Sequence, residues 1–222
     1  DQTASAVGGL VTIDFADKAH PDIRPVNFDF STAGHALCII DSRADHADLT
    51  DDYASVPAEM KAAAAYFGKE VLRDVDESEF ITAIPALREK LGDRAILRSL
   101  HFFEENKRVD AAYEAAKAKD AQGLLDAITE SGHSSWEWLQ NCYCVQDCKD
   151  QKITLALALT KLFLNKIGKG VCRIHGGGFA GVIMCVVPKE ETENYVQYMS
   201  EYMGRENVYP MNVRTFGAGH VA

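Results

Sequence analysis

The sequence lacks any long apolar run and has few basic residues for its size. No segment of the 222 residues approaches the roughly 18 apolar residues of a membrane span, so we expect no membrane partner. Lys and Arg number 23 against 33 Asp and Glu, which gives a net charge of −10. Because binding to duplex nucleic acid calls for a basic patch, this balance argues against a nucleic-acid partner. With 47% apolar residues, the composition is typical of one large or two small globular domains.

Cysteines are present, but the paired spacing of common zinc sites is missing. Three of the six cysteines lie in apolar, strand-like runs, where a free thiol acts as a small buried hydrophobe: Cys38, Cys172 and Cys185. The others form a Cys-x-Cys-x-x-x-Cys cluster: Cys142, Cys144 and Cys148. A metal site there is the alternative to free thiols. Since zinc sites favour Cys-x-x-Cys pairs, we predict no metal and reduced thiols in a cytoplasmic protein.

The most informative segment is 171–183, where glycines separate two apolar, β-forming runs. Gly176, Gly177, Gly178 and Gly181 fall within six positions. Glycine reaches positive φ freely and has no side chain, so such a loop can bring backbone N–H groups close to an anion such as phosphate. A tight connection between two strands is the alternative interpretation.

Two common phosphate-binding motifs do not fit this glycine segment. Its spacing Gly-x-Gly-x-x-Gly matches the dinucleotide fingerprint, but that motif needs a helix after the glycines. Here an apolar run over 182–187 follows and ends at Pro188, which predicts a buried strand. A Walker loop is excluded because no Lys-Ser or Lys-Thr follows. We therefore predict a strand, a glycine turn and a second strand that lean over a bound group.

Hydrophobic periodicity predicts an α+β protein with an antiparallel sheet and helices packed on one face. Strands are predicted at 11–15, 26–30, 35–41, 171–175, 182–187 and 208–216. Helices are predicted at 1–7, 44–67 with an interruption at Pro57, 77–91, 93–119, after the cap Asp120, at 153–167 and at 189–203.

The glycine segment resembles the third conserved motif of the GHMP kinases, most of all that of the galactokinases. The family's loop reads Gly-Gly-Gly-Phe-Gly-Gly or Gly-Gly-Gly-Phe-Ala-Gly after a short strand, and the second form stands at 176–181. Further segments resemble the family in its order: Asp1-Gln2 with Gly8-Gly9, the strand 35–41, His46 with Tyr53, 98–108 around His101, 130–135, and Gly217-Ala218-Gly219. The resemblance covers nearly the whole chain.

The resemblance implies that the chain is the carboxyl-terminal portion of a longer kinase. Residues 1–33 would be a remnant of the N-terminal catalytic domain, and 34–222 the GHMP kinase C-terminal domain with a ferredoxin-like sheet. The family's Gly-Glu-His and Gly-Leu-Ser-Ser-Ser motifs are missing from this sequence. ATP and Mg²⁺ would therefore be held mainly by the absent N-terminal half, and the portion alone would be inactive. Its exposed domain interface could support self-association.

The activity implied is ATP-dependent phosphorylation of the anomeric hydroxyl of galactose or a related hexose. By resemblance, Asp1 would be the catalytic base, Tyr53 would hydrogen-bond the sugar, and Gly176, Gly177 and Gly178 would close over sugar and phosphates. From the residues alone, Asp1 could instead cap a helix and Tyr53 could be a half-buried helix aromatic. We expect Asp1 and the glycine loop to form one wall of a shared cleft.

Other functions and sites stay open at this point. The protein could be another small-molecule GHMP kinase, acting on N-acetylgalactosamine, fucose or mevalonate, or a non-catalytic sensor of sugar and ATP. His175 stands where galactokinases often carry threonine, so it could contact a phosphate or only end a strand. An acidic, His-containing flank could suggest a metal but better fits a solvated helix start: His46, Asp48, Asp51 and Asp52.

Overall fold

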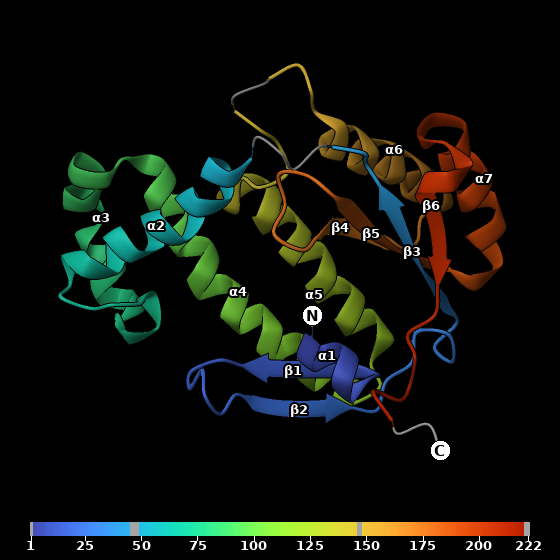
Figure 1. Cartoon of the computed structure of the whole chain (residues 1–222), viewed down its shortest axis with the longest axis horizontal. Coiled ribbons are helices and arrows are strands. Elements are labelled where there is room, and N and C mark those ends of the chain that lie inside the picture. The colour runs from blue at the N-terminus through green and yellow to red at the C-terminus, as the bar shows by residue number, and fades with distance from the viewer. Residues whose placement is uncertain (1, 45–48, 146–147, 220–222) are drawn as a thin grey trace.

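The computed structural model describes residues 2–44, 49–145 and 148–219 (Figure 1). A four-stranded sheet contains β3 (His35–Asp41), β4 (Val171–His175), β5 (Val182–Pro188) and β6 (Val208–Met211). Its strand order is β4-β5-β3-β6, and every neighbouring pair is antiparallel. A separate hairpin pairs β1 (Leu10–Asp14) with β2 (Asp22–Val26).

The four-stranded sheet has ferredoxin-like connectivity. Helix α6 (Lys152–Ile167) lies between β3 and β4 in the chain order, and α7 (Thr192–Met203) lies between β5 and β6. The order β3, α6, β4, β5, α7, β6 is the βαββαβ pattern of ferredoxin-like sheets. The predicted α+β class is therefore confirmed.

A group of helices is inserted between β3 and α6. It comprises α2 (Thr50–Tyr66), α3 (Glu77–Leu91), α4 (Asp93–Lys117) and α5 (Ala121–Ser134). Short turns join them: the 3₁₀ turn η1 (Leu72–Asp74) and the π-helical turn η2 (Ser135–Leu139). The predicted cap is confirmed, because the Asp120 carboxylate accepts a hydrogen bond from the Gly123 N–H at the start of α5.

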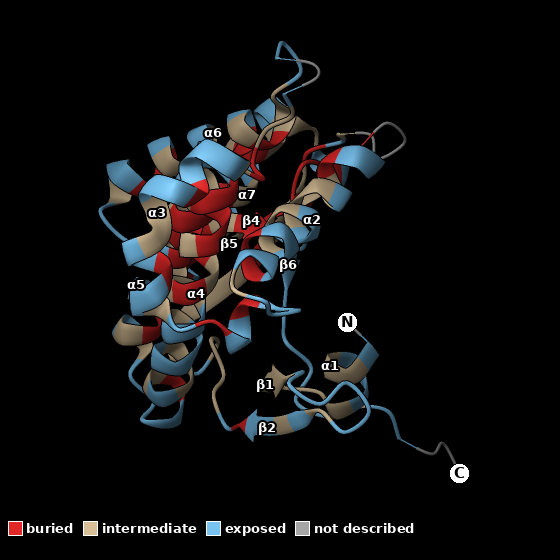
Figure 2. Cartoon of the chain, turned by 90° about the vertical axis from the view of Figure 1, so that its left-hand side faces the viewer, coloured by how far each residue is buried: buried red, intermediate tan, exposed pale blue. Residues whose placement is uncertain are grey.

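The main core lies between the sheet and helices α6 and α7. Cys172, Cys185 and Cys38 stand at paired positions on three neighbouring strands and are all buried there, as the sequence predicted. Helix α6 packs on β4 and β5, α7 packs on β6, β3 and β5, and Figure 2 shows buried residues gathered in the central region where α7, β4 and β5 overlap in that view. On the opposite face, Leu125 of α5 packs against Val171 and Val186. The glycine loop between β4 and β5 therefore extends from a sheet supported on both faces.

The hairpin and the first helix form a more exposed layer. The strand β2 has one buried residue, Val26, which packs against Ala116 and Leu124 of the inserted helices. Helix α1 (Gln2–Val7) buries no residue and ends where Gly8 takes a φ of 77°, which confirms the predicted glycine stop. Figure 2 shows α1, β1 and β2 mainly as exposed and half-buried segments.

The structure corrects several predicted boundaries. The second strand is Asp22–Val26 and not 26–30, because Phe28 and Phe30 turn inward to stack on each other at 5.2 Å and pack beside Val26. Helix α2 begins at Thr50 and continues through Pro57, because its packing against α4 outweighs the single hydrogen bond that proline removes.

The last part of the chain also differs from the prediction. The 3₁₀ turn η3 (Lys189–Glu191) precedes α7, and η4 (Arg205–Asn207) precedes β6. The final strand ends at Met211 rather than near 216, and Met211 pairs with Leu37 as the last pair between β6 and β3. No helix within the described ranges is both long and apolar enough to cross a membrane.

Candidate active site

The glycine loop joins β4 to β5 through a series of left-handed backbone conformations. The φ angles are 81° at Gly176, 89° at Gly178 and 90° at Gly181, and Phe179 has 59°. Side chains with a Cβ rarely adopt these angles, so the glycines let the chain reverse direction here. The predicted strand, glycine turn and strand are confirmed. A strained, buried phenylalanine within such a turn is typical of loops whose shape is fixed by their surroundings.

Tyr53 of α2 lies against one side of this loop. Its ring meets the Phe179 ring edge to face at a centroid distance of 5.5 Å. A Cβ on Gly177 would stand 2.5 Å from Cε1 of Tyr53, so the absence of a side chain lets the ring approach. The backbone of Gly177 lies outside the left-handed region, so a glycine is needed at this position for steric reasons. The structure thus brings together four residues predicted for the sugar site: Tyr53, Gly176, Gly177 and Gly178.

Asn141 supports the loop from the other side. Its carbonyl accepts a hydrogen bond from the Phe179 N–H at 2.5 Å, and its side-chain Nδ2 donates to the Gly177 carbonyl at 3.1 Å. A Cβ on Gly178 would stand 2.4 Å from the Asn141 carbonyl oxygen. At the far end of the loop, the Ser42 N–H and hydroxyl both donate to the Gly181 carbonyl.

Sequence reasoning missed both Asn141 and Ser42. Ser42 follows the predicted strand 35–41 directly, so its place at the sheet edge could have been inferred from the chain order. Asn141 follows Gln140, whose φ of 58° ends the π-helical turn η2, and no local pattern predicts that bend.

The outer side of the loop presents free backbone donors. Gly176 and Gly177 are exposed, and within the described part of the chain their N–H groups donate to no acceptor. Nothing lies within 4 Å of where a Gly176 Cβ would be, so this side is open. N–H groups that have no acceptor within the described residues, at two consecutive exposed residues, suit an anionic group such as a phosphate.

The acidic flank before α2 divides into residues with different surroundings. Asp51 is exposed, as predicted, but Asp52 is 8% exposed and accepts a hydrogen bond from the Cys144 thiol at 3.1 Å. The prediction that Asp52 is solvated was therefore wrong, because the chain around Cys144 folds over it. His46 and Asp48 lie outside the described residues.

The predicted partnership of Asp1 with the glycine loop stays a prediction. Asp1 lies outside the described residues. Helix α1, which follows it, contacts β1 and the tail, where the Ala218 N–H donates to the Ala6 carbonyl. His175 ends β4 at the surface; partial burial and then the charge of Arg173 lower the pKa of its imidazole. No contact of His175 identifies its role.

Partial burial raises the pKa of the Tyr53 phenol. The hydroxyl therefore stays protonated at neutral pH and can both donate and accept a hydrogen bond.

The described residues form no group of three or more His, Cys, Asp or Glu side chains suited to a metal ion. The six cysteines are free thiols. Burial raises the pKa of Cys38 and of Cys172 to about 11 and that of Cys142 to about 12, which keeps these thiols protonated.

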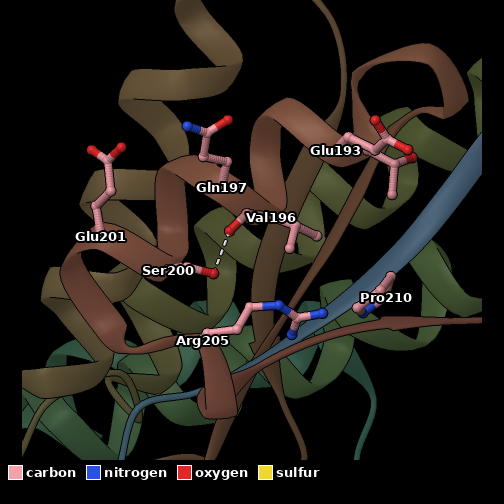
Figure 3. A pocket seen from close by; sticks show the side chains of 8 residues that line it. Glu193, Val196, Gln197, Ser200, Glu201, Arg205 and Pro210 are labelled. Atoms are coloured by element: carbon pink, nitrogen blue, oxygen red, sulfur yellow. Dashed lines mark hydrogen bonds between the residues drawn. The ribbon is translucent and has the colours of Figure 1, made fainter.

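Two surface hollows lie away from the glycine loop. One of about 620 Å³ lies between α7 and β6, where Arg205 extends toward Pro210 (Figure 3). Two of its polar groups bond within the protein: Arg205 donates to the Val208 carbonyl, and the Ser200 hydroxyl donates to the Val196 carbonyl. The other, of about 710 Å³, lies between the β1–β2 hairpin and α4. Neither is lined by Tyr53 or the glycines.

Known proteins are similar to this chain in sequence. A galactokinase of Glaesserella parasuis is 34% identical over 204 residues, which are 90% of this chain and 49% of that protein. A galactokinase of Actinobacillus pleuropneumoniae is 34% identical over 87% of this chain and 47% of its own length. The chain thus spans about half the length of the curated relatives it matches. No family model matches it.

Solved structures agree with the sequence comparison. Lactococcus lactis galactokinase complexed with galactose superposes with a TM-score of 0.70 at 18% identity, over 98% of this chain and 54% of that one. L. major mevalonate kinase in complex with R-mevalonate gives 0.58 at 12% identity, over 97% and 52%. The fold is therefore that of the GHMP kinases. In sequence, the chain is similar to the galactokinases, which confirms the resemblance predicted from its motifs.

Proposed function

We propose that the complete protein is an ATP-dependent sugar kinase that phosphorylates the anomeric hydroxyl of galactose or a related hexose. The observation that carries this proposal is the glycine loop that packs directly against Tyr53 in a chain similar to galactokinases. Phosphoryl transfer depends mainly on positioning and on charge neutralisation, and both can be supplied by such a loop and its neighbours.

Each candidate residue has a distinct role in this proposal. Tyr53 hydrogen-bonds a sugar hydroxyl through its phenol, which is protonated at neutral pH and can both donate and accept a hydrogen bond. Gly176, Gly177 and Gly178 close over the sugar and phosphates, with the exposed amides of the first two as donors to anionic oxygens. Asp1 accepts the proton of the attacking hydroxyl.

The residues present fit part of a nucleotide site. The open side of the loop at Gly176 offers room and free N–H donors for a phosphate. When bound, ATP supplies the phosphoryl group and Mg²⁺ neutralises its charge. We place the main ATP and Mg²⁺ ligands in the half of the relatives that this chain does not span. In this proposal residues 1–33 belong to the N-terminal catalytic domain and 34–222 to the C-terminal domain, and the chain alone is inactive.

The test is ADP release by the full-length protein with galactose, N-acetylgalactosamine, fucose and mevalonate offered separately. We expect turnover with a hexose and none with mevalonate. Gly177→Val should abolish it, because the new side chain displaces Tyr53. Binding of sugar and ATP without turnover by the wild-type protein would support a sensor instead and reject the kinase proposal.

A further inference from the structure

Arg98 of α4 is the largest side chain that is fully buried in the described structure, with 1% of its surface exposed. Its Nε donates to the Leu139 carbonyl at 3.1 Å. Its Nη1 donates to the Ser55 hydroxyl at 2.8 Å and to the Glu59 carboxylate at 3.0 Å. One guanidinium therefore joins α4 to two other segments.

The first of these segments carries Tyr53. Ser55 and Glu59 lie on α2, and the Ser55 hydroxyl donates in turn to the Asp52 carbonyl at 2.7 Å. Tyr53 stands between Asp52 and Ser55 in the same helical turn. Arg98 thereby fixes the turn from which the tyrosine ring reaches Gly177.

The second segment carries Asn141. Leu139 is the last residue of the π-helical turn η2, and its carbonyl is held by Arg98. Two residues later, Asn141 binds the loop through the Phe179 N–H and the Gly177 carbonyl. π-helical turns often occur at functional sites, because they displace the chain that follows them.

We propose that Arg98 is a positioning residue that sets where Tyr53 and Asn141 stand on opposite sides of the glycine loop. Its effect on catalysis rests on the proposed kinase function, but its effect on the loop does not. A buried cation needs nearby partners to offset the loss of water, and a single carboxylate with two neutral acceptors is a modest set. A buried arginine at position 98 is explained if its planar guanidinium is needed to bond both segments at once. A lysine ammonium cannot make these bonds in the same geometry.

Arg94 provides a matched control one turn earlier on α4. Its Nε and Nη2 both donate to Glu59, the carboxylate that Arg98 also binds. Within the described residues its hydrogen bonds do not reach Ser55 or Leu139, and its side chain is 43% exposed. Arg94→Lys therefore changes an ion pair with the same carboxylate and leaves the bonds of Arg98 to Ser55 and Leu139 in place.

The experiment compares Arg98→Lys, Arg94→Lys and the wild type in the full-length protein by amide hydrogen exchange. We expect Arg98→Lys to accelerate exchange of the Phe179 amide, whose acceptor is Asn141, while the β3–β5 amides keep wild-type rates. Arg94→Lys should leave the exchange rates of the Phe179 amide and of the β3–β5 amides unchanged. Unchanged exchange at Phe179 in Arg98→Lys, or an equal rise in the β3–β5 amides, overturns the proposal.

Kinetics form the second readout. Displacing reactive groups by about 1 Å can cost about 10²-fold, so Arg98→Lys should lower kcat/KM for the sugar by that order and leave the KM for ATP unchanged. If Arg98→Lys does not fold, Ser55→Ala removes one of the two bonds from Arg98 to α2, keeps the bond to Glu59, and should give a smaller loss of the same kind. A wild-type protein that phosphorylates no sugar rejects the proposed function, and the exchange experiment still decides the role of Arg98.

Discussion

Glycines allow close approach at two places in this molecule, and the two differ in their surroundings. In the loop after β4, Gly177 and Gly178 face Tyr53 and Asn141, in a region where Phe179 and Ala180 are buried. At the ends of the chain, a Cβ on Gly217 would stand 1.9 Å from the Ala6 carbonyl oxygen, among half-buried and exposed residues.

The comparison shows that a close backbone contact can have different consequences. The loop glycines shape a turn that both faces of the sheet and two further segments support, so a change there reaches the candidate site. The contact at Gly217 joins the tail to α1, which buries no residue. We expect substitutions in the loop to affect activity and global stability, and substitutions at the chain ends to affect local attachment with little change in global stability.

Gly178→Ala is expected to have the largest effect. The residue has a φ of 89° and no room beside the Asn141 carbonyl at 2.4 Å, so both backbone and neighbour must shift. We expect a loss of about 3 kcal/mol in the free energy of unfolding and at least about 10²-fold in kcat/KM. Denaturant unfolding and sugar-dependent ADP release measure the two effects.

The matched control is Gly176→Ala. Gly176 has a similar φ of 81°, but nothing lies within 4 Å of its Cβ position. Gly176→Ala should lower the free energy of unfolding by only about 1 kcal/mol, which is the cost of a left-handed backbone at a residue with a Cβ. Equal losses in the two variants would show that contact with Asn141 does not matter.

A pair of substitutions at Gly177 and Tyr53 ranks second. In Gly177→Ala the new methyl group pushes against Cε1 of Tyr53, whose ring can rotate aside. We therefore expect a loss of about 1 kcal/mol in the free energy of unfolding, and weaker sugar binding. In a Tyr53→Ala background the added methyl group meets no ring, and its cost should vanish. A thermodynamic cycle from unfolding data measures this coupling, and strictly additive losses would contradict the packing.

The sequence predicted the parts of this site that depend on local pattern. The helical spacing of Phe80 and Leu87 predicts the helix Glu77–Leu91, and the structure has the same first and last residues. The glycines predict the turn after β4. Long-range supports have no such pattern: Asn141 meets Gly178 only because η2 bends the chain. Val26, Phe28 and Phe30 alternate with other residues as in a strand. In the structure they pack against α4 and α5 and do not form one strand.

Gly217→Ala tests the other side of the comparison. The new methyl group collides with the Ala6 carbonyl, so the tail should separate from α1. Exchange should accelerate at the amides of Gly9 and Ala218, which donate to Arg214 and Ala6, while the free energy of unfolding changes by less than about 1 kcal/mol. A loss as large as that of Gly178→Ala would remove the distinction between the two regions.

Cysteine reactivity should report the smallest effect, and it separates the two regions within one molecule. In the native protein Cys148 is exposed and Cys144 half-buried, so a thiol reagent should modify these two. Cys142 is 1% exposed, burial raises its pKa to about 12, and it adjoins Asn141 beneath the loop. Because the thiolate is the reactive form, Cys142 should stay unmodified.

The loop and tail variants should then differ in a third site of labelling. Gly178→Ala displaces Asn141 and should make Cys142 slowly reactive, whereas Gly217→Ala should leave it protected. Mass spectrometry of timed reactions identifies the modified residues, with Cys185, fully buried between β4 and β3, as the internal standard. Modification of Cys142 and Cys185 at equal rates would indicate global opening, and the link between the loop and Asn141 would lose its support.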